Sequence, residues 1–355
     1  MKILVNALSG NGDALMFSPA LRILKEKNPS SGIDMLVMFK SVQQMYEKNP
    51  FLDNIYFIDF LKQSKLKSLK EVLKLRKNKY DYTINIYPSN RLEYNIVSFF
   101  EGGKKRISHH YDHTKFLRGE FLNNILINEV KDKHNVLQNA EIVRKIVDFK
   151  DEEAGGMEIF ISEEYEKNAK EWVKEINPEN KLLIGFHPGS ALLKNHIHKR
   201  WAKEKYLKLG ELLMKEYNAK ILLFGNEFDL NEEINSFLDN RGVIASTNNY
   251  MDSMARMKYC KLFVSNDTAF LHSAAAFNIP VVAIFGYTNH KELFPWNTKH
   301  IIVRKNLGCS PCFFNSPRPA TCLWRGDEEF KCMKLLTVDD VVTACRMLIK
   351  SANIK

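Results

Sequence analysis

The sequence has 355 residues, of which 45% are hydrophobic and 26% are charged, and it carries a formal net charge of +10. This composition is that of an ordinary globular protein and excludes a fibrous or disordered chain. The length predicts two domains, at roughly 150 residues each, and no window approaches the ~20 uninterrupted apolar residues that a membrane span needs.

The chain opens with a short apolar run, residues 3–8, that is followed at once by polar residues 9–13. This pattern is typical of a buried strand that enters a loop and not of a signal peptide, so we expect a cytoplasmic protein. Further strands are expected at residues 35–39, 55–58, 82–86, 182–187, 220–224, 262–265 and 281–285. Amphipathic stretches at 19–27, 205–217 and 270–277 lie between many of them. The alternation predicts an α/β protein with parallel sheets covered on both faces.

The boundary between the two halves is expected near residues 150–180. A loop at 151–156 and a helix at 162–176 precede the buried strand that starts at residue 182. The charge is divided unequally, since residues 1–150 hold 25 Lys and Arg against 16 Asp and Glu. The first half is therefore predicted to face an anionic partner.

Residues 62–79 are the most basic part of the chain, with eight Lys and Arg against the single acid Glu71. Leu66, Leu69 and Leu73 recur at helical spacing, which predicts a basic amphipathic helix. Two interpretations are a solvated helix face and adhesion to an anionic membrane surface. Nucleic acid ranks lower, because the segment has no aromatic interleaving and no recognisable nucleic-acid motif.

The polar residues 9–13 contain two glycines, but Leu15 stands where a dinucleotide fingerprint needs glycine. A Rossmann NAD site is therefore weakly supported. The turn sets Asp13 at the carboxyl end of a strand, before a helix that starts near residue 18. Asp13 is either a turn cap or a general base.

Three further motifs follow strands in the second half. His187, Gly189 and Ser190, with Lys199 shortly after, suit a phosphate. Glu227 suits a ribose diol, and a helix N-terminal charge interaction is equally compatible with it. Residues 266–269 turn into a helix of small residues, whose free N–H groups would hold a diphosphate. His272 lies in the first turns of that helix and is either structural or part of the site.

Four of the six cysteines follow the spacing C-x2-C-x9-C-x9-C, and they are Cys309, Cys312, Cys322 and Cys332. The spacing resembles a tetrathiolate clip for Zn or Fe with a structural role. The alternative is a set of reduced thiols. Cys260 and Cys345 are predicted to be core residues.

Taken together and in this order, the segments resemble glycosyltransferase family 9, the ADP-heptose:lipopolysaccharide heptosyltransferases. The resemblance rests on the opening strand with Gly12-Asp13, on the Gly-Lys-Lys-Arg-Ile of 103–107 and on the His-Pro-Gly-Ser of 187–190. It also rests on Lys199 to Trp201, on residues 264–272, on residues 279–288 and on Cys-Ser-Pro-Cys at 309–312.

The resemblance implies a GT-B fold, in which two Rossmann-like domains face each other across a cleft. Residues 1–170 would bind the acceptor, with Lys104, Lys105 and Arg106 as contacts, and residues 171–355 would bind the nucleotide sugar. The last helix would return toward the first domain. The implied partners are an ADP-sugar, an anionic glycolipid acceptor and the inner face of the cytoplasmic membrane, without nucleic acid.

The implied reaction is an inverting transfer that needs no catalytic cofactor. Asp13 would be the base, and Lys199 would neutralise charge on the departing ADP. The other donor contacts would be His187, Gly189, Ser190, Glu227, Asp267, Thr268, Ala269 and His272.

Ala269 and Tyr287 depart from the family pattern, as does the His-rich insert at 192–198, so the sugar stays open. One alternative is an autotransporter-type heptosyltransferase that modifies protein, which the four cysteines keep in view. Another is a catalytically silent module that binds a nucleotide sugar or nucleic acid.

Overall fold

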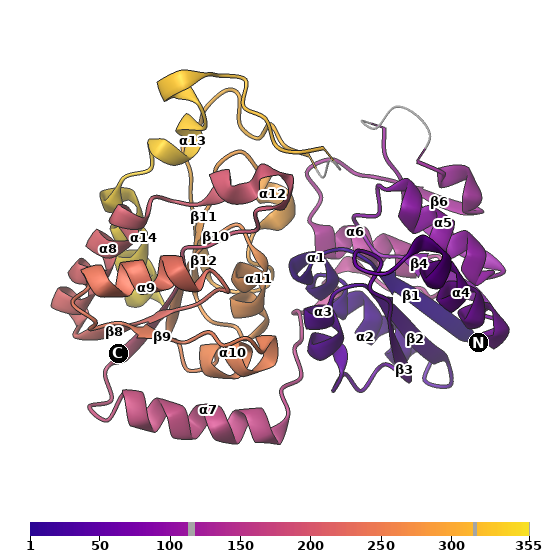
Figure 1. Cartoon of the computed structure of the whole chain (residues 1–355), viewed down its shortest axis with the longest axis horizontal. Coiled ribbons are helices and arrows are strands. Elements are labelled where there is room, and N and C mark those ends of the chain that lie inside the picture. The colour runs from indigo at the N-terminus through magenta and orange to yellow at the C-terminus, as the bar shows by residue number, and fades with distance from the viewer. Residues whose placement is uncertain (113–117, 315–317, 355) are drawn as a thin grey trace. The chain divides into compact units, whose positions relative to one another are not determined.

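The computed structural model describes residues 1–112, 118–314 and 318–354. The chain forms two compact units, one of residues Met1–Phe160 and one that begins at Ile161 and includes the segment after Arg318. Each unit contains a six-stranded sheet in which every neighbouring pair of strands is parallel (Figure 1). This confirms the predicted α/β class.

The sheet of the first unit has the order β3-β2-β1-β4-β5-β6. Its strands are β1 (Lys2–Ala7), β2 (Gly32–Val37), β3 (Asn54–Phe57), β4 (Tyr82–Asn85), β5 (Lys105–His110) and β6 (Ile125–Asn128). The strand order reverses between β1 and β4. Open α/β sheets bind ligands beyond the carboxyl ends of the strands at such a switch point.

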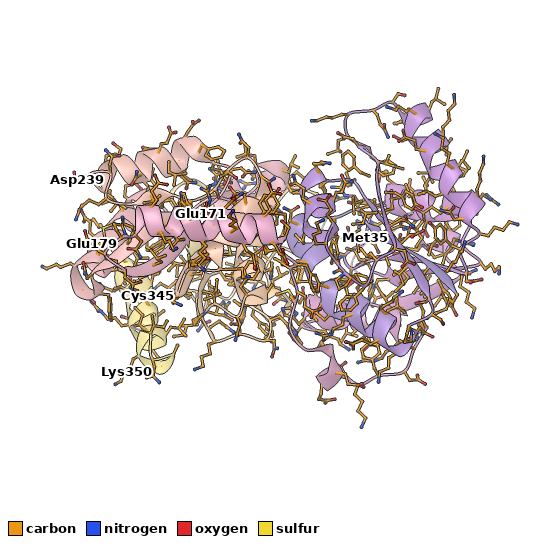
Figure 2. The ribbon with its side chains drawn as sticks, turned by 90° about the horizontal axis from the view of Figure 1, so that it is seen from below. Met35, Glu171, Glu179, Asp239, Cys345 and Lys350 are labelled. Atoms are coloured by element: carbon orange, nitrogen blue, oxygen red, sulfur yellow. The ribbon has the colours of Figure 1, made fainter. Side chains whose placement is uncertain are left out.

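The α-helices of this unit are α1 (Asn11–Leu15), α2 (Ser18–Lys27), α3 (Lys40–Tyr46), α4 (Lys65–Leu75) and α5 (Leu92–Glu101), which lie between its strands, and α6 (Asn135–Val143), which follows β6. The helices α4 and α5 pack against each other. Val72, Leu75 and Val97 from this pair join Leu4 and Leu36 of the sheet in one core cluster. Parallel strands bury both faces, so Met35 of β2, which Figure 2 labels, is also fully buried.

The sheet of the second unit has the order β12-β11-β10-β7-β8-β9 and reverses between β10 and β7. Its strands are β7 (Leu182–His187), β8 (Ala219–Leu223), β9 (Val243–Ile244), β10 (Leu262–Asn266), β11 (Val281–Ile284) and β12 (His300–Val303). Its α-helices are α7 (Glu163–Ile176), α8 (Lys203–Tyr217), α9 (Phe228–Phe237), α10 (Tyr250–Met257), α11 (Ala269–Ala276), α12 (His290–Leu293), α13 (Lys331–Lys334) and α14 (Val338–Ser351).

The last long helix belongs to the second unit. α14 packs against α8, β11 and β12, and its Cys345, labelled in Figure 2, lies in the core that these elements share. The return of this helix toward the first domain, which the resemblance implies, stays a prediction. Thr337 caps α14, and the reciprocal hydrogen bond from its backbone to Asp340 completes a capping box.

Short 3-10 turns complete the description: η1 (Arg76–Asn78), η2 (Glu120–Leu122), η3 (Asp151–Ala154), η4 (Leu193–Lys199) and η5 (Gly326–Glu328). In the described parts of the chain, none of the helices combines the length and the apolar character that crossing a bilayer requires.

One local expectation changes. Residues 11–15 form the short helix α1 instead of an open turn, so Asp13 sits in a first helical turn. The predicted basic helix is present as α4, in which Leu66 is 74% and Leu73 is 40% exposed. Its buried residues are Ser68, Val72 and Leu75.

Candidate active site

The predicted donor residues gather at the switch point of the second sheet. β7 ends at His187 and β10 ends at Asn266, and these two strands are neighbours in the sheet. Asn266 ties the two strand ends together, because its amide nitrogen donates to the carbonyl oxygens of Pro188 (2.9 Å) and Gly189 (3.1 Å). Its side-chain oxygen accepts from the backbone N–H of Trp201 at 3.1 Å. The 187–190 loop and the segment around Lys199 are thus fixed to one another.

A nearly buried ion pair lies at the centre of this group. The Nζ of Lys199 is 2.7 Å from an Oδ of Asp267, and the two side chains are 15% and 5% exposed. Burial alone would raise the pKa of Asp267, but the charge and hydrogen bond of Lys199 outweigh it and hold this pKa below its usual value. Asp267 is therefore ionised, and the positive charge of Lys199 is balanced before any ligand arrives.

His187 links two other predicted donor residues. Its Nδ1 is 2.8 Å from the hydroxyl of Thr268, and its Nε2 lies 3.7 Å from a carboxylate oxygen of Glu227. Its ring stacks on Phe270 with the centroids 4.4 Å apart. This contact fixes the imidazole plane between the two polar partners.

Glu227 is held between glycines and a second cation. The guanidinium of Arg200 lies 3.4 Å from its carboxylate. Burial would raise the pKa of Glu227, but His187 and Arg200 keep it below the usual value. A Cβ at Gly189 would stand 2.3 Å from the Glu227 carboxyl carbon, and one at Gly225 would stand 2.7 Å from a carboxylate oxygen. The site therefore needs glycine at both positions.

The N-terminus of α11 offers backbone N–H groups to the same region. Thr268 is the N-cap residue, but its side chain makes no capping hydrogen bond and contacts His187 instead. Ala269 is the first residue of the helix. An uncapped helix N-terminus carries a partial positive charge and binds phosphate groups.

His272 is buried in α11, with 3% of its surface exposed. Burial lowers its pKa to about 4, so the imidazole is neutral at pH 7. Its Nδ1 has no hydrogen-bond partner among the residues that the structure describes. Such an orphaned nitrogen is costly unless a ligand or water satisfies it.

The insert at 192–198 forms η4 and packs against the cysteine segment. Ser190 donates its hydroxyl hydrogen bond to the carbonyl of His196 (2.8 Å), and Arg200 donates to the carbonyl of Ser190 (2.7 Å). His196 in turn lies 3.1 Å from the hydroxyl of Tyr287, and His198 stacks on Phe330 at 3.9 Å. Tyr287, one of the departures from the family pattern, thus connects the insert to the cysteine segment.

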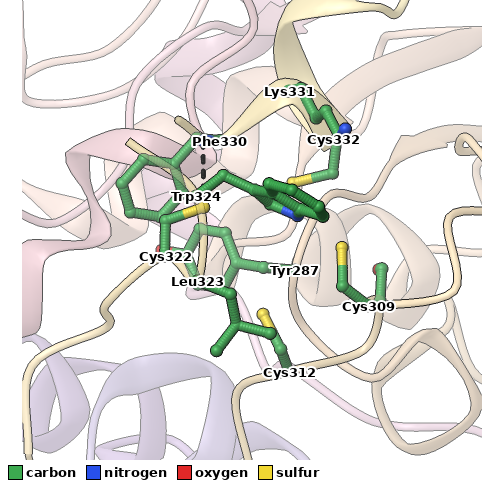
Figure 3. A pocket seen from close by; sticks show the side chains of 10 residues that line it. Tyr287, Cys309, Cys312, Cys322, Leu323, Trp324, Phe330, Lys331 and Cys332 are labelled. Atoms are coloured by element: carbon green, nitrogen blue, oxygen red, sulfur yellow. Dashed lines mark hydrogen bonds between the residues drawn. The ribbon is translucent and has the colours of Figure 1, made fainter. Parts of the chain in front are cut away.

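The four spaced cysteines lie around one small cavity, together with Tyr287, Trp324 and Phe330 (Figure 3). The backbone N–H of Phe330 donates to the Sγ of Cys322 at 3.2 Å. No three His, Cys, Asp or Glu side chains among residues 1–112, 118–314 and 318–354 are grouped tightly enough to hold a metal ion. The metal therefore stays a prediction. Cys260 and Cys345 are buried, as predicted.

Asp13 lies at the switch point of the first sheet, because α1 follows β1 directly. Its charge and those of Arg91 and Glu93 act on Tyr94, the pKa of which rises to about 12 mainly through burial. Arg91 stands at the N-cap position of α5, without a capping side-chain hydrogen bond, and α5 follows the neighbouring strand β4. Arg91 and Tyr94 thus share the surroundings of Asp13.

The basic triplet Lys104, Lys105 and Arg106 lies at the other edge of this sheet. In the sheet, Lys105 of β5 pairs with Tyr82 of β4, and Tyr82 pairs with Ile3 of β1. The triplet therefore lies at the amino end of β5. Lys104 is bound to Asp81 (2.8 Å), and Arg106 donates to the carbonyl of Leu122 (2.6 Å). This placement argues against contacts between the triplet and an acceptor at Asp13.

Comparison with known protein families identifies the family of this chain. Residues 69–320 match the model of glycosyltransferase family 9 (heptosyltransferase). This chain belongs to glycosyltransferase family 9. It is therefore a glycosyltransferase, as the motifs predicted.

Family 9 relatives match over almost the whole chain. A lipooligosaccharide heptosyltransferase 2 of Campylobacter jejuni is 23% identical, with all of both chains covered. The solved structure of E. coli ADP-heptose lps heptosyltransferase II superposes with a TM-score of 0.74 at 20% identity, covering 99% of this chain and 100% of that one. These likenesses confirm the GT-B fold.

A third solved structure is the iron-containing dodecameric glycosyltransferase TibC of enterotoxigenic E. coli. It has a TM-score of 0.58 at 11% identity, and the alignment covers 99% of this chain and 76% of that one.

Sequence reasoning missed several residues that the structure places beside the predicted site residues. Arg200 was passed over between Lys199 and Trp201, although a cation next to a predicted phosphate-binding lysine is itself a signal. Asn266 could also have been predicted, because it begins the Asn-Asp-Thr turn that contains Asp267 and Thr268. Phe270, Arg91 and Tyr94 carried no such signal, because their contacts depend on strands far apart in the sequence.

Proposed function

We propose that this protein transfers heptose from ADP-heptose to a hydroxyl group of a lipopolysaccharide core or lipid A-type acceptor, with inversion and without a catalytic metal. The observation that carries the proposal is the convergence of Lys199, Asp267, Glu227 and the uncapped start of α11 at the switch point of the second sheet. The names of its relatives support heptose as the sugar and a lipooligosaccharide as the acceptor.

In the donor site, the diphosphate would lie at the N-terminus of α11, near Thr268 and Ala269, with Lys199 beside it. Lys199 is paired with Asp267, but its ammonium group has further N–H donors. These donors and the helix N–H groups would stabilise the negative charge that develops on the departing ADP. Glu227 would accept hydrogen bonds from the ribose hydroxyls. The buried Nδ1 of His272 would receive one from a sugar hydroxyl.

In the transfer step, Asp13 acts as the general base. Its carboxylate takes the proton of the acceptor hydroxyl while that oxygen forms a bond to the anomeric carbon of heptose. The bond between this carbon and the diphosphate oxygen breaks on the opposite side, and ADP leaves with the electron pair. A single displacement inverts the anomeric centre.

The two domains would divide this work as the resemblance implies, with residues 1–170 holding the acceptor and 171–355 the donor. The acceptor is an anionic glycolipid, and the first half of the chain carries most of the net positive charge. We place the enzyme in the cytoplasm, at the inner face of the cytoplasmic membrane, without a nucleic-acid partner.

A protein acceptor is the second candidate, and the four-cysteine cavity favours it. A Zn or Fe ion there would be structural, held by Cys309, Cys312, Cys322 and Cys332. The thiols surround one cavity, but they would have to move closer together to ligate one ion. The metal would brace the segment that contacts Tyr287 and would take no part in the transfer.

The proposal is tested by incubating the protein with ADP-heptose and a lipopolysaccharide acceptor that lacks the heptose, and by measuring the product by mass spectrometry. Asp13→Asn should lower the transfer rate by about 10²–10⁴-fold, the usual contribution of a general base, and leave ADP affinity unchanged. Transfer that tolerates this change with little loss contradicts the assignment. Transfer to a protein and not to the glycolipid favours the second candidate.

A further inference from the structure

The helix α4 has two apolar faces, and only one of them is used inside the fold. Ser68, Val72 and Leu75 form the buried face against α5 and the sheet. Leu66 and Leu73 are 74% and 40% exposed. They are seven residues apart, which puts them on one side of the helix at a spacing of roughly 10 Å. Exposed leucines on the side away from the core have no role in folding.

Basic side chains surround these two leucines. By helical geometry, Lys70 and Lys74 lie beside them on the outer side of α4, and both are exposed. None of the ion pairs found within residues 1–112, 118–314 and 318–354 includes a Lys or Arg of residues 62–79. Elsewhere in the first unit, by contrast, Lys25, Lys27 and Lys104 each have a carboxylate partner.

The single acid of the segment does not reduce this charge by pairing with it. Glu71 accepts a hydrogen bond from the amide of Gln63 at 2.9 Å, and it lies toward the buried side of the helix. The outer side of α4 is thus a cationic surface with two apolar side chains in it, which we call the α4 face (Leu66, Lys70, Leu73 and Lys74).

We propose that the α4 face docks on an anionic lipid bilayer, with Leu66 and Leu73 inserted among the head groups and the lysines bound to lipid phosphates. A helix that lies in the membrane interface has this composition: an apolar stripe that enters the boundary and basic residues that contact anionic lipids. Long lysine side chains reach the phosphates while their alkyl stems cover apolar surface.

This proposal rests on the proposed function, and the place of α4 in the fold connects the two. α4 joins the parallel strands β3 and β4, so it runs back from the carboxyl edge of the sheet to the amino edge. Its first turn, with Leu66, is therefore on the side of the sheet where Asp13 lies. A bilayer at α4 would present a lipid-anchored acceptor to the edge that holds the proposed base.

The test is cosedimentation of the whole protein with phosphatidylcholine vesicles, with and without phosphatidylglycerol. The wild-type protein should bind the anionic vesicles much more tightly than the neutral ones. Lys70→Glu/Lys74→Glu should weaken this binding by at least roughly 25-fold, since each basic residue near an anionic surface contributes about fivefold. The matched control Lys167→Glu/Lys170→Glu makes the same charge change on exposed positions of α7 and should bind as wild type.

The apolar part of the contact is measured at high salt, where the lysine contribution is screened. Leu66→Ser/Leu73→Ser should lower the remaining binding on the order of tenfold. The control Phe237→Ser/Met347→Ser alters side chains of similar exposure, 57% and 58%, in the second unit, and should change nothing. All four changes of the α4 face are at exposed positions, so folding should be preserved.

Three results would overturn the proposal: equal losses in the control variants, unchanged vesicle binding by both α4 variants, or tighter binding of an oligonucleotide than of anionic vesicles. Glycosyl transfer to a delipidated, water-soluble acceptor separates this proposal from the proposed function. If only docking is wrong, the wild type still transfers the sugar. If the function is wrong, no variant transfers it, whatever the vesicles show.

Discussion

The Lys199–Asp267 pair makes a quantitative prediction about the stability of the second unit. Lys199→Met keeps an unbranched side chain that is one atom shorter and removes its charge. Asp267 then stays 5% exposed without its counter-ion, and breaking a buried ion pair in this way costs about 3–5 kcal/mol. We expect the free energy of unfolding to fall by about 3 kcal/mol, the lower end of that range, since Lys199 keeps some contact with water.

The loss should depend on pH in a defined direction. In the wild type the pKa of Asp267 is lowered, so the pair contributes stability above the ordinary aspartate pKa, and this contribution disappears as the pH falls through the lowered value. In Lys199→Met burial raises the pKa of Asp267, so stability is lost as the pH rises. The difference between the two proteins should therefore be largest at pH 7, shrink as the pH falls, and be smallest below the lowered pKa that Asp267 has in the wild type.

Tryptophan fluorescence during denaturation is the suitable assay, because all four tryptophans of the sequence lie after residue 161 and report on the second unit alone. Lys203→Met is a matched control. Lys203 is paired with Glu233 at the surface, so its loss should cost less than about 1 kcal/mol. Two results would refute this account of the ion pair: a loss of stability in Lys199→Met no larger than in Lys203→Met, or a loss that does not depend on pH.

Three further predictions concern other sites. Burial raises the pKa of Glu101 to about 8, so the first unit should lose stability as the pH rises from about 4.5 to 8. Thermal unfolding of Glu101→Gln should show no such decrease of stability with pH. The same pH dependence in the wild type and the variant would contradict this prediction. Gly189→Ala should displace Glu227 and weaken ADP binding about tenfold. In the control Gly308→Ala, the added Cβ has nothing within 4 Å, so ADP binding should stay as in the wild type. Equal affinities of the two variants for ADP would mean that Glu227 does not bind the ribose. Elemental analysis should find about one Zn or Fe per chain, absent from a variant with the four spaced cysteines changed to serine, and metal-free wild type would leave these residues as thiols.

The sequence predicted the central strands well, because buried parallel strands are short continuous apolar runs. All eight expected strands are present as β1 to β4, β7, β8, β10 and β11. Among the four missed strands, β5 reads Lys-Arg-Ile-Ser-His-His and lacks that signal, and β9 has only two residues. β6 (Ile-Leu-Ile-Asn) and β12 (His-Ile-Ile-Val) do contain apolar runs, but these runs are three residues long and lie in edge strands with partly exposed side chains.

The donor motifs were predictable because each follows a strand at the edge where ligands bind. Their pairing was not, since it depends on strand order. In the fold β10 lies beside β7, and this neighbourhood brings Asp267 to Lys199. Neither motif contains this information by itself. The same limitation applies to the basic triplet: the resemblance implied that it contacts the acceptor, whereas its register puts it at the amino edge of the sheet, opposite the edge where Asp13 lies.

The helix α4 shows that the spacing of leucines does not by itself identify the face that packs inside the fold. Leu66, Leu69 and Leu73 have helical spacing, and so do Ser68, Val72 and Leu75. Hydrophobic count favours the first set, but α5 and the sheet bury the second. A small polar residue such as Ser68 at a close helix contact gives no apolar signal in the sequence.

The central claim is that an ADP-sugar binds at the switch point of the second sheet, and calorimetric titration with ADP, UDP and GDP tests it most directly. We predict preferential binding of ADP, weakened at least tenfold by Glu227→Ala, about 1.4 kcal/mol for the lost ribose contacts. Glu232→Ala, an exposed glutamate on the neighbouring helix α9, should bind ADP as the wild type does. Absence of nucleotide binding, or equal affinity in both variants, would contradict the claim.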